Sequence, residues 1–238
     1  MIEAHHLIKR FGHKSVLRNL EFQVEQGEFV ALLGPNGAGK TTFLRILASL
    51  SRPTMGIVQV AGYSLPRQAA AVRRRLGVVS HLPLLYGDLS AGQNLRFYGR
   101  MYSVADLDRR IADVLELVGL AKRERDLVRT FSRGMQQRLA IGRAVLHDPE
   151  VLLLDEPHTG LDQDACEMLD GALKQVTGRG RTIVMTSHDM ARAADLASRF
   201  DVLSRGNIVA SVQAVDLPQD GLLAFYRKAV SVREESHG

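Results

Sequence analysis

The sequence predicts an α/β fold, in which a buried parallel sheet is flanked by helices and joined by an antiparallel β layer and an inserted helical segment. Short apolar runs of strand length recur at residues 29–33, 151–154 and 182–186, as expected for strands that are buried on both faces. Each run leads through a glycine-rich or polar turn into a helical pattern, the order that builds a parallel sheet. From about residue 88 to 146, strand signals are nearly absent.

The composition narrows the classes of protein that fit. The chain has 238 residues, of which 45% are hydrophobic and 24% are charged, enough for one α/β core plus a subdomain. No window approaches 18 apolar residues, so no segment is expected to cross a bilayer. The net charge of +5 is mild, and Arg73–Arg75, its only tight basic run, is interpreted as a solvated helix face. The single cysteine, Cys166, excludes an internal disulfide and suits a reducing cytosol.

The first part of the chain alternates strand and helix signals. Two strands of mixed polarity, with turns at Gly12 and Gly27, are expected to pair as an antiparallel layer. The expected elements are strands at 2–8, 16–24 and 29–33, a helix at 42–50, a strand at 57–60, a helix at 69–76 and a strand at 76–80.

The middle of the chain is expected to be helical. Ile111, Val114, Leu115 and Val118 recur at i, i+3, i+4 and i+7, which places them on one helix face. The expected helices lie at 93–101, 104–118 and 134–146. The α/β pattern then resumes with a strand at 151–154, a helix at 164–176, a strand at 182–186, a helix at 190–199, a β-ribbon at 200–212 and a helix at 222–230. We therefore expect an α/β core at 1–87 and 150–238 and a helical subdomain at 88–149.

The segment Gly34–Thr42 fits the phosphate-loop pattern G-x-x-x-x-G-K-[ST] at every fixed position. It lies between a predicted buried strand and a predicted helix, so its backbone N–H groups and the helix dipole would converge on an anion. A chance glycine-rich turn is the alternative, and the flanking strand and helix argue against it. The residues expected to contact a nucleotide are Gly34, Pro35, Asn36, Gly37, Ala38, Gly39, Lys40, Thr41 and Thr42. Lys40 would reach the β- and γ-phosphates of ATP, and the Thr41 hydroxyl would ligate Mg²⁺.

Two further strand ends carry candidate catalytic groups. Val151–Leu154 is followed by Asp155 and Glu156, at the strand end where ligands bind in open α/β sheets. Asp155 would hold Mg²⁺, and Glu156 would orient or deprotonate the attacking water. His188 follows the strand at 182–186 and could donate a hydrogen bond to the γ-phosphate. Taken alone, Asp155 and Glu156 could simply be acidic residues at the end of a strand. Taken alone, His188 could be an ordinary loop residue.

The segment Phe131–Ala144, Phe-Ser-Arg-Gly-Met-Gln-Gln-Arg and onward, resembles the signature of ATP-binding-cassette (ABC) proteins, usually written LSGGQ. The phosphate loop, this signature, Asp155-Glu156-Pro157, the turn Gly160–Asp162 and His188 occur in that family's order and spacing along the whole chain. The resemblance implies an α/β P-loop NTPase (RecA-like) core with an antiparallel β subdomain and an inserted α-helical subdomain. It also implies that Phe11 stacks on adenine.

The same resemblance implies a mechanism of head-to-tail dimers. In the family, each ATP lies between the phosphate loop of one subunit and the signature of another. Here the in-trans group would be Ser132, Arg133, Gly134 and Met135, with Ser132 and the Gly134 N–H completing the γ-phosphate cage. Asp162 matches the residue that passes the state of one site to the other. The catalytic set would be Glu156, His188 and Lys40, with ATP and Mg²⁺ as cofactors.

Several positions depart from the family pattern. His81 stands where a coupling glutamine is usual, and we expect it to couple to a membrane subunit more than to contact Mg²⁺. Arg133 replaces a glycine whose backbone makes the contact, which is tolerable if its φ is negative. Met135 replaces a glutamine, so ATPase activity should be kept while the ATP-bound dimer forms less tightly. His158 replaces the usual Ser or Thr, and is expected to be a solvent-side turn residue.

The implied partners are a second nucleotide-binding subunit, expected as a homodimer, and a separate polytopic membrane permease, with no nucleic acid. The chain would then lie on the cytoplasmic face of the cell membrane as a peripheral subunit. Within the family, several segments look most like the ATPase of the haem exporter of cytochrome-c maturation: Gly77–His81, Leu84–Leu89, Asn94–Tyr98 and Phe131–Arg138. The ATPase of a drug, lipid or antibiotic exporter is the alternative. A non-transport ABC ATPase is disfavoured because neither a coiled-coil insertion nor a second cassette is present.

Overall fold

The computed structural model describes residues 1–80, 82–178 and 180–231. Its strands are β1 (Ile2–Phe11), β2 (Lys14–Val24), β3 (Phe29–Leu33), β4 (Met55–Val60), β5 (Tyr63–Leu65), β6 (Leu76–Val79), β7 (Val151–Asp155), β8 (Thr182–Thr186), β9 (Arg199–Ser204) and β10 (Asn207–Gln213). Its helices are α1 (Lys40–Leu47), α2 (Ala69–Arg74), α3 (Ala91–Met101), α4 (Leu107–Leu117), α5 (Arg133–Val145), α6 (Gln163–Thr177), α7 (Met190–Leu196) and α8 (Gly221–Ser231), with short 3₁₀ turns η1 (Ala121–Arg123), η2 (Val128–Thr130) and η3 (Ala214–Asp216).

The central sheet has the strand order β10-β9-β3-β8-β7-β6. Strands β9, β3, β8, β7 and β6 are mutually parallel, and β10 turns back antiparallel to β9. The carboxyl ends of β3, β7 and β8 therefore lie along one edge of the sheet, which is where an α/β fold places its ligand. The predicted ribbon at 200–212 is confirmed, and its first strand also extends the parallel sheet.

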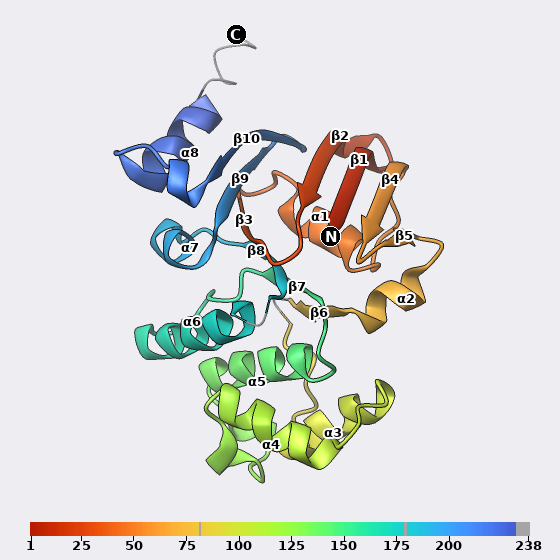
Figure 1. Ribbon diagram of the computed structural model, residues 1–238, viewed down its shortest axis with the longest axis vertical. Coiled ribbons are helices and arrows are strands. Elements are labelled where there is room, and N and C mark those ends of the chain that lie inside the picture. Colours follow the sequence, from red (N-terminus) through yellow and green to blue (C-terminus); the bar gives the residue numbers. More distant parts are fainter. Residues whose placement is uncertain (81, 179, 232–238) are drawn as a thin grey trace.

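A second sheet, of order β2-β1-β4-β5, is antiparallel throughout. It stands to one side of the central sheet at the upper right of Figure 1, with α1 lying between the two sheets. The predicted antiparallel layer is thus present.

Alternate residues of the central strands supply two apolar clusters, one on each face of the sheet. Phe29, Ala31 and Leu33 of β3 pack with the helices α3–α6. Val30 and Leu32 pack instead with α1 and the antiparallel sheet. This explains why the β3 sequence is apolar at every position, since neither face of the strand meets water.

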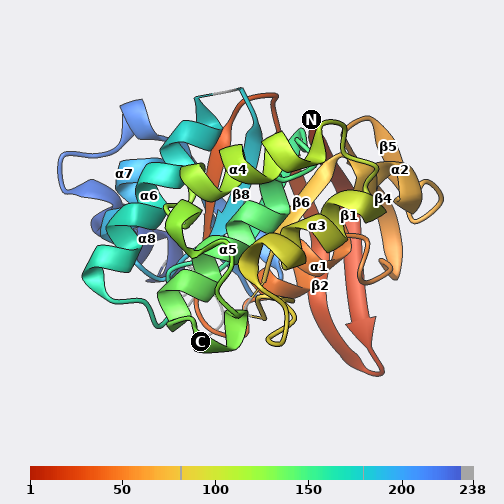
Figure 2. The same ribbon diagram turned by 90° about the horizontal axis from the view of Figure 1, so that it is seen from below.

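The helices α3, α4 and α5 form a layer below the sheet, which Figure 2 shows from beneath. Ile111, Val114 and Leu115 of α4 are buried and share the apolar cluster of β3 and β7, as their spacing predicts. The helical layer and the sheet therefore share a hydrophobic core, and the subdomain limits 88 and 149 remain a prediction. No helix in the described parts of the chain is both long and apolar enough to cross a membrane.

Element limits differ from the sequence predictions at several turns. The helix expected at 104–118 begins at Leu107, because Asp106 has a left-handed φ of 44°. The helix expected to reach residue 199 ends at Leu196, since Arg199 joins β9. The short strand β5 was not predicted, because its three residues carry no periodic signal and its strand conformation depends on pairing with β4.

Candidate nucleotide-binding and hydrolysis site

The turn between β3 and α1 brings the phosphate-loop backbone to the edge of the sheet. Gly34 has a φ of 150°, and a Cβ at that position would lie 2.1 Å from the carbonyl oxygen of Leu203. Only glycine permits this approach of the loop to β9. The loop ends at Gly39, the N-cap of α1, whose backbone has a left-handed φ of 115°. The helix N-terminus therefore opens onto the loop, as anion binding requires.

Lys40 lies at the centre of the predicted site. It is buried, and its Nζ donates to the carbonyl oxygens of Gly34 at 2.6 Å and Pro35 at 3.3 Å. Burial lowers the pKa of Lys40, while the carboxylates of Glu156 and Asp155 act in the opposite direction. The ammonium group is thus held inside the loop, between the backbone and the two carboxylates, where a phosphate would meet it.

Asp155 ends β7, and its side chain receives two hydroxyl groups. Thr186 Oγ1 donates to Asp155 Oδ1 at 2.8 Å, and Thr41 Oγ1 donates to the same oxygen at 3.3 Å. Mg²⁺ in phosphate-loop sites takes oxygen ligands from one or two protein groups and from the phosphates. The hydroxyl of Thr41 and the carboxylate of Asp155 fit that donor set, so these two residues would hold Mg²⁺.

Glu156 is set against His188. The Nε2 atom of His188 lies 2.8 Å from Glu156 Oε1 and 3.5 Å from Lys40 Nζ. Glu156 has a left-handed φ of 54°, and its backbone N–H donates to Thr186 Oγ1 at 2.9 Å. A non-glycine residue in that backbone region is strained and is retained where the surroundings require it. The arrangement suits a carboxylate that takes a proton from water while a histidine meets the terminal phosphate.

Thr186 was not predicted as a site residue. It is fully buried and pairs with Asp155 in the β7–β8 register. Its one hydroxyl fixes both the Asp155 carboxylate and the Glu156 backbone. The signal in the sequence was its place at the end of a strand, but only the register shows which residue it faces.

A cleft of about 300 Å³ opens at the phosphate loop. Its walls are the loop and Thr42, with Glu156 and His188 on one side and Lys14 and Val16 on the other. Lys14 and Val16 were not predicted; they belong to the start of β2, where Lys14 pairs with Phe11. Phe11 is 55% exposed at the end of β1, with Lys9 Nζ 4.7 Å from its ring centroid, and its stacking on adenine stays a prediction.

The signature segment begins α5. Ser132 is the N-cap, and its Oγ accepts from the Met135 N–H at 3.2 Å. Arg133 is the first residue of the helix, which meets the condition on its φ. A Cβ on Gly134 would lie 2.7 Å from the Cβ of Ala165 on α6, so glycine is needed for this helix contact.

In the described residues, no hydrogen bond joins the side chain of Ser132 to the phosphate loop; its Oγ bonds within α5. Arg133 and Gln136 line a cavity of about 680 Å³ together with Asn36 and His188. Asp162 caps α6, accepting from the Ala165 N–H at 2.8 Å. His81, predicted as a coupling residue, lies outside the described residues.

Two other predictions have clear outcomes. Cys166 is buried, and burial raises its pKa, in agreement with a packed thiol. The interpretation of His158 as a solvent-side turn residue is wrong: its side chain is 8% exposed and its Nε2 lies 2.7 Å from Asp170 Oδ1. The sequence misled because the partner carboxylate lies twelve residues further on, on α6.

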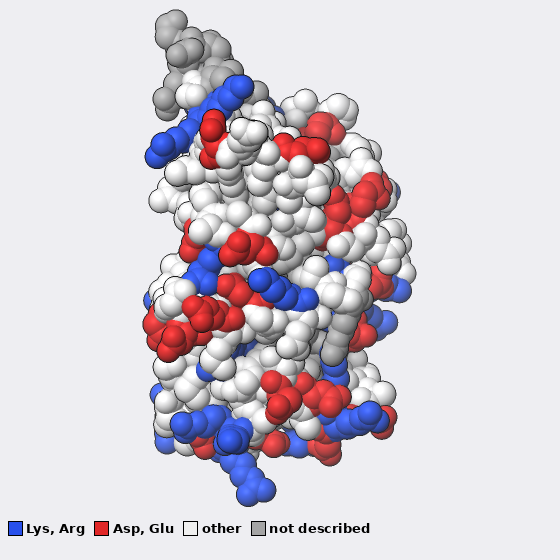
Figure 3. All heavy atoms as spheres, turned by 60° about the vertical axis from the view of Figure 1, so that its left-hand side comes forward, with Lys and Arg blue, Asp and Glu red and all other residues white. Residues whose placement is uncertain are grey.

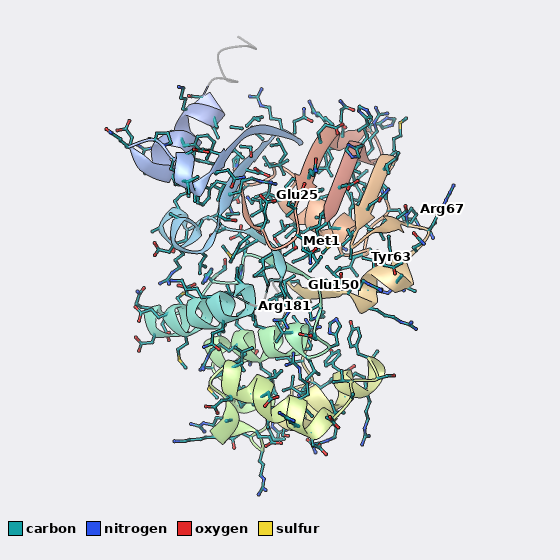
Figure 4. All side chains as sticks on the ribbon, viewed as in Figure 1. Met1, Glu25, Tyr63, Arg67, Glu150 and Arg181 are labelled. Atoms are coloured by element: carbon teal, nitrogen blue, oxygen red, sulfur yellow. The ribbon has the colours of Figure 1, made fainter. Side chains whose placement is uncertain are left out.

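Cavity size alone does not identify this site. A larger cavity, of about 730 Å³, lies at the amino ends of the strands, lined by Met1, Glu150, Arg181 and other residues. Figure 4 shows these three side chains between the sheet and the helical layer. Neither a phosphate-loop glycine nor Asp155 or Glu156 lines it.

Comparison with known proteins agrees with the site. The family profile described as "ABC transporter" matches residues 17–159. The chain belongs to the ABC transporter family. It is 36% identical to the "Linearmycin resistance ATP-binding protein LnrL" of Bacillus subtilis (strain 168), in an alignment that covers 91% of this chain and 70% of that protein. It is 38% identical to the "Nod factor export ATP-binding protein I" of Cupriavidus pinatubonensis (strain JMP 134 / LMG 1197), in an alignment that covers 91% of this chain and 67% of that protein. A "Daunorubicin resistance ATP-binding protein DrrA3" of Streptomyces coeruleorubidus is 38% identical, covering 88% of this chain and 67% of that protein.

Solved structures place the fold in the same family. An "ATP binding subunit of ABC transporter" has a TM-score of 0.88 at 28% identity, covering 97% of this chain and 99% of that one. A dimeric ATP-binding cassette in a post-hydrolysis state, bound to ADP and Pi, has a TM-score of 0.81 at 26% identity over 90% of this chain and 99% of that one. The predicted α/β P-loop fold, with its antiparallel β subdomain and its helical part, is confirmed. The chain is an ATP hydrolase that uses ATP and Mg²⁺.

Proposed function

We propose that this ABC subunit powers an exporter of antibiotic or drug-like molecules. The proposal rests on the names of the chain's relatives, which concern resistance to linearmycin and daunorubicin and export of Nod factor. These names favour the drug or antibiotic alternative over haem export in cytochrome-c maturation, which they do not support. They also speak for transport over a role on DNA or ribosomes.

In the proposed cycle two copies of the chain close around MgATP. Lys40, Thr41, Asp155, Glu156 and His188 would hold it from one side. The geometry that supports this is the exposed start of α5, where Ser132 Oγ accepts from the Met135 N–H of its own helix. Ser132 and Gly134 of a second copy would then bind the γ-phosphate. Loss of that phosphate on hydrolysis removes the group held by both copies, and the dimer opens.

The membrane permease would dock on an apolar patch that we name the 82–101 patch. Its members are exposed by 41% to 67%: Leu82, Leu84, Tyr86, Phe97 and Met101. Tyr86 packs edge-on against Phe97 with 5.1 Å between ring centroids, and Met101 lies one helical turn beyond Phe97. Exposed apolar side chains that gather on one segment and the helix after it support an interaction site. It lies where the central sheet passes into the helical layer, so a partner there would contact both. We infer that this docking holds the subunit on the cytoplasmic face of the membrane.

The face that carries α6 and α7, on the left of Figure 1, has a different character. Acidic and basic side chains are interspersed over it (Figure 3). A surface that binds the phosphate backbone of a nucleic acid has one sign of charge. The mixed surface is therefore in keeping with protein partners.

The transport proposal is tested by deleting the reading frame in its host. We expect increased sensitivity to linearmycin or daunorubicin, with c-type cytochromes at normal levels on a haem-stained gel. Loss of c-type cytochromes with unchanged drug sensitivity would return the function to haem export. Complementation with Glu156→Gln should fail, which ties the phenotype to ATP hydrolysis.

The docking proposal is tested by co-purification from membranes. Substituting Phe97→Ser together with Leu84→Ser should release the subunit from its membrane protein while ATP binding is kept. Leu223→Ser, at an exposed apolar residue on α8, is the matched control. Retention of the double variant on the membrane protein would refute this docking surface.

A further inference from the structure

We propose that His158, Asp170 and Arg192 form a positioning network that holds the loop carrying Glu156 and the loop carrying His188 in their working arrangement. The inference rests on ATP hydrolysis at Glu156. It adds residues that none of the predicted site positions includes. The three side chains come from three separate segments: the turn after β7, the middle of α6 and the start of α7.

The contacts run in an unbroken chain. His158 Nε2 lies 2.7 Å from Asp170 Oδ1, and Asp170 Oδ2 lies 2.6 Å from an Arg192 Nη1. The side chains are 8%, 17% and 15% exposed respectively. Buried charge-assisted hydrogen bonds of this kind are strong and directional. The Nδ1 of His158 is buried without a partner among the described residues, so the ring is held through Nε2.

Arg192 links Asp170 to two further segments. Its Nη2 donates to Gln163 Oε1 at 2.7 Å, one residue after Asp162. Its Nε lies 3.3 Å from Asp189 Oδ2, one residue after His188. A planar guanidinium presents its N–H groups in a fixed fork that reaches all three acceptors at once, whereas those of an ammonium project from a single nitrogen atom.

The network therefore reaches each segment that surrounds the Glu156–His188 contact. His158 is two residues from Glu156, Gln163 is next to Asp162, and Asp189 is next to His188. A cavity of about 310 Å³ is lined by Glu156, His188, Asp162 and members of the network. No member touches the phosphate loop in any described contact. We infer that the network sets the distance between Glu156 and His188, and so the rate of hydrolysis, without contributing to ATP affinity.

The test compares steady-state ATPase kinetics of full-length variants. His158→Ala and Asp170→Asn should lower kcat about tenfold, because small displacements of catalytic groups are costly, while KM for ATP changes less than about twofold. His158→Gln should keep kcat within about threefold of the parent, because its amide can donate from the position of Nε2. Asp195→Asn, at an exposed carboxylate on the same helix as Arg192, is the matched control and should leave kcat unchanged.

A merely structural role would give a different pattern. In that case His158→Gln would be as impaired as His158→Ala, or the rate would fall only where the unfolding midpoint falls. Unchanged kcat in His158→Ala, or equal losses in kcat and ATP affinity, would overturn the proposal. Should His158→Ala not fold, Arg192→Lys decides: we expect kcat to fall about fivefold, since a lysine keeps only part of the guanidinium contacts. A parental kcat in Arg192→Lys would overturn the network.

The result is separable from the function proposed above. Glu156→Gln should trap an ATP-bound dimer, and adding His158→Ala should leave that dimer intact, because the phosphate contacts are untouched. Failure of Glu156→Gln alone to form a dimer would count against the dimer mechanism and leave the kinetic test of the network standing.

Discussion

The phosphate loop and the signature segment are both turns that open a helix, yet they differ in what completes them. Around the loop, Lys40 donates to the Gly34 carbonyl and lies 3.5 Å from His188, and Thr41 donates to Asp155, all within one chain. At the start of α5, Ser132 is bonded to its own helix, and Arg133 and Asn36 line one cavity of about 680 Å³. In the proposed dimer the loop would hold the nucleotide from one side, and the signature of a second copy would close the site. Variants on the two sides should therefore fail in different assays.

The largest effect is expected from Glu156→Gln. Loss of the general base should reduce ATP hydrolysis by about 10²- to 10⁴-fold, with MgATP binding retained and a dimer accumulating on size-exclusion chromatography. Glu150→Gln is the matched control, since Glu150 precedes the opposite end of β7 and pairs with Arg75. A Glu156→Gln variant that stays monomeric with ATP would contradict the division between a complete loop and an incomplete signature.

Lys40→Ala should abolish binding on the loop side. Removing a buried charged contact should weaken ATP affinity by about a hundredfold or more, as measured by fluorescent-nucleotide titration with single subunits. Lys14→Ala, at the exposed edge of the same cleft, should change affinity by less than about threefold because solvent screens its charge. Similar effects for the two lysines would mean that the loop has been misread.

Thr186→Val tests the support beneath the carboxylates. It leaves the Asp155 carboxylate and the Glu156 N–H without their shared hydroxyl, which should cost about 1–3 kcal/mol in unfolding free energy and about tenfold in hydrolysis. Urea unfolding and ATPase assays measure both. Thr182→Val, on the same buried strand, loses contacts remote from the carboxylates and should lower stability without the rate loss.

Ser132→Ala should act only when two subunits meet. ATP binding by a single subunit should be unchanged, while dimer formation in the Glu156→Gln background should weaken about tenfold through a lost hydrogen bond to a charged group. Loss of the N-cap should also cost about 1 kcal/mol in unfolding free energy. Weakened ATP binding by isolated subunits would contradict a role for Ser132 across the dimer, because it would mean that Ser132 contacts the nucleotide of its own chain.

The smallest effect is expected from Met135→Gln. A restored polar contact across the dimer should prolong the ATP-bound state by a few-fold, about the value of one hydrogen bond, as seen in dimer dissociation rates. Met168→Gln, at an exposed methionine on α6, is the control. A shortened lifetime would show that the methionine makes a favourable contact of its own.

Local motifs with a one-dimensional spacing could be read directly from the sequence. The phosphate loop, Asp155-Glu156 and the α4 face all depend on neighbours within a few residues, and the structure has them where they were expected. Thr186 and His158 could not be read, because their partners Asp155 and Asp170 lie on other elements. Strand β5 escaped for a related reason, as its stability comes from pairing rather than from propensity.

The two apolar clusters on either face of the central sheet have a mechanical consequence. Side chains of β3 alternate between them, so a shift of the helical layer strains Phe29, Ala31 and Leu33 but leaves the packing of Val30 and Leu32 on α1 in place. The sheet therefore separates two packing environments, and the helical layer α3–α5 belongs to only one of them. A displacement of the helical layer would then act on the strand ends, while α1, which opens onto the phosphate loop, would keep its packing.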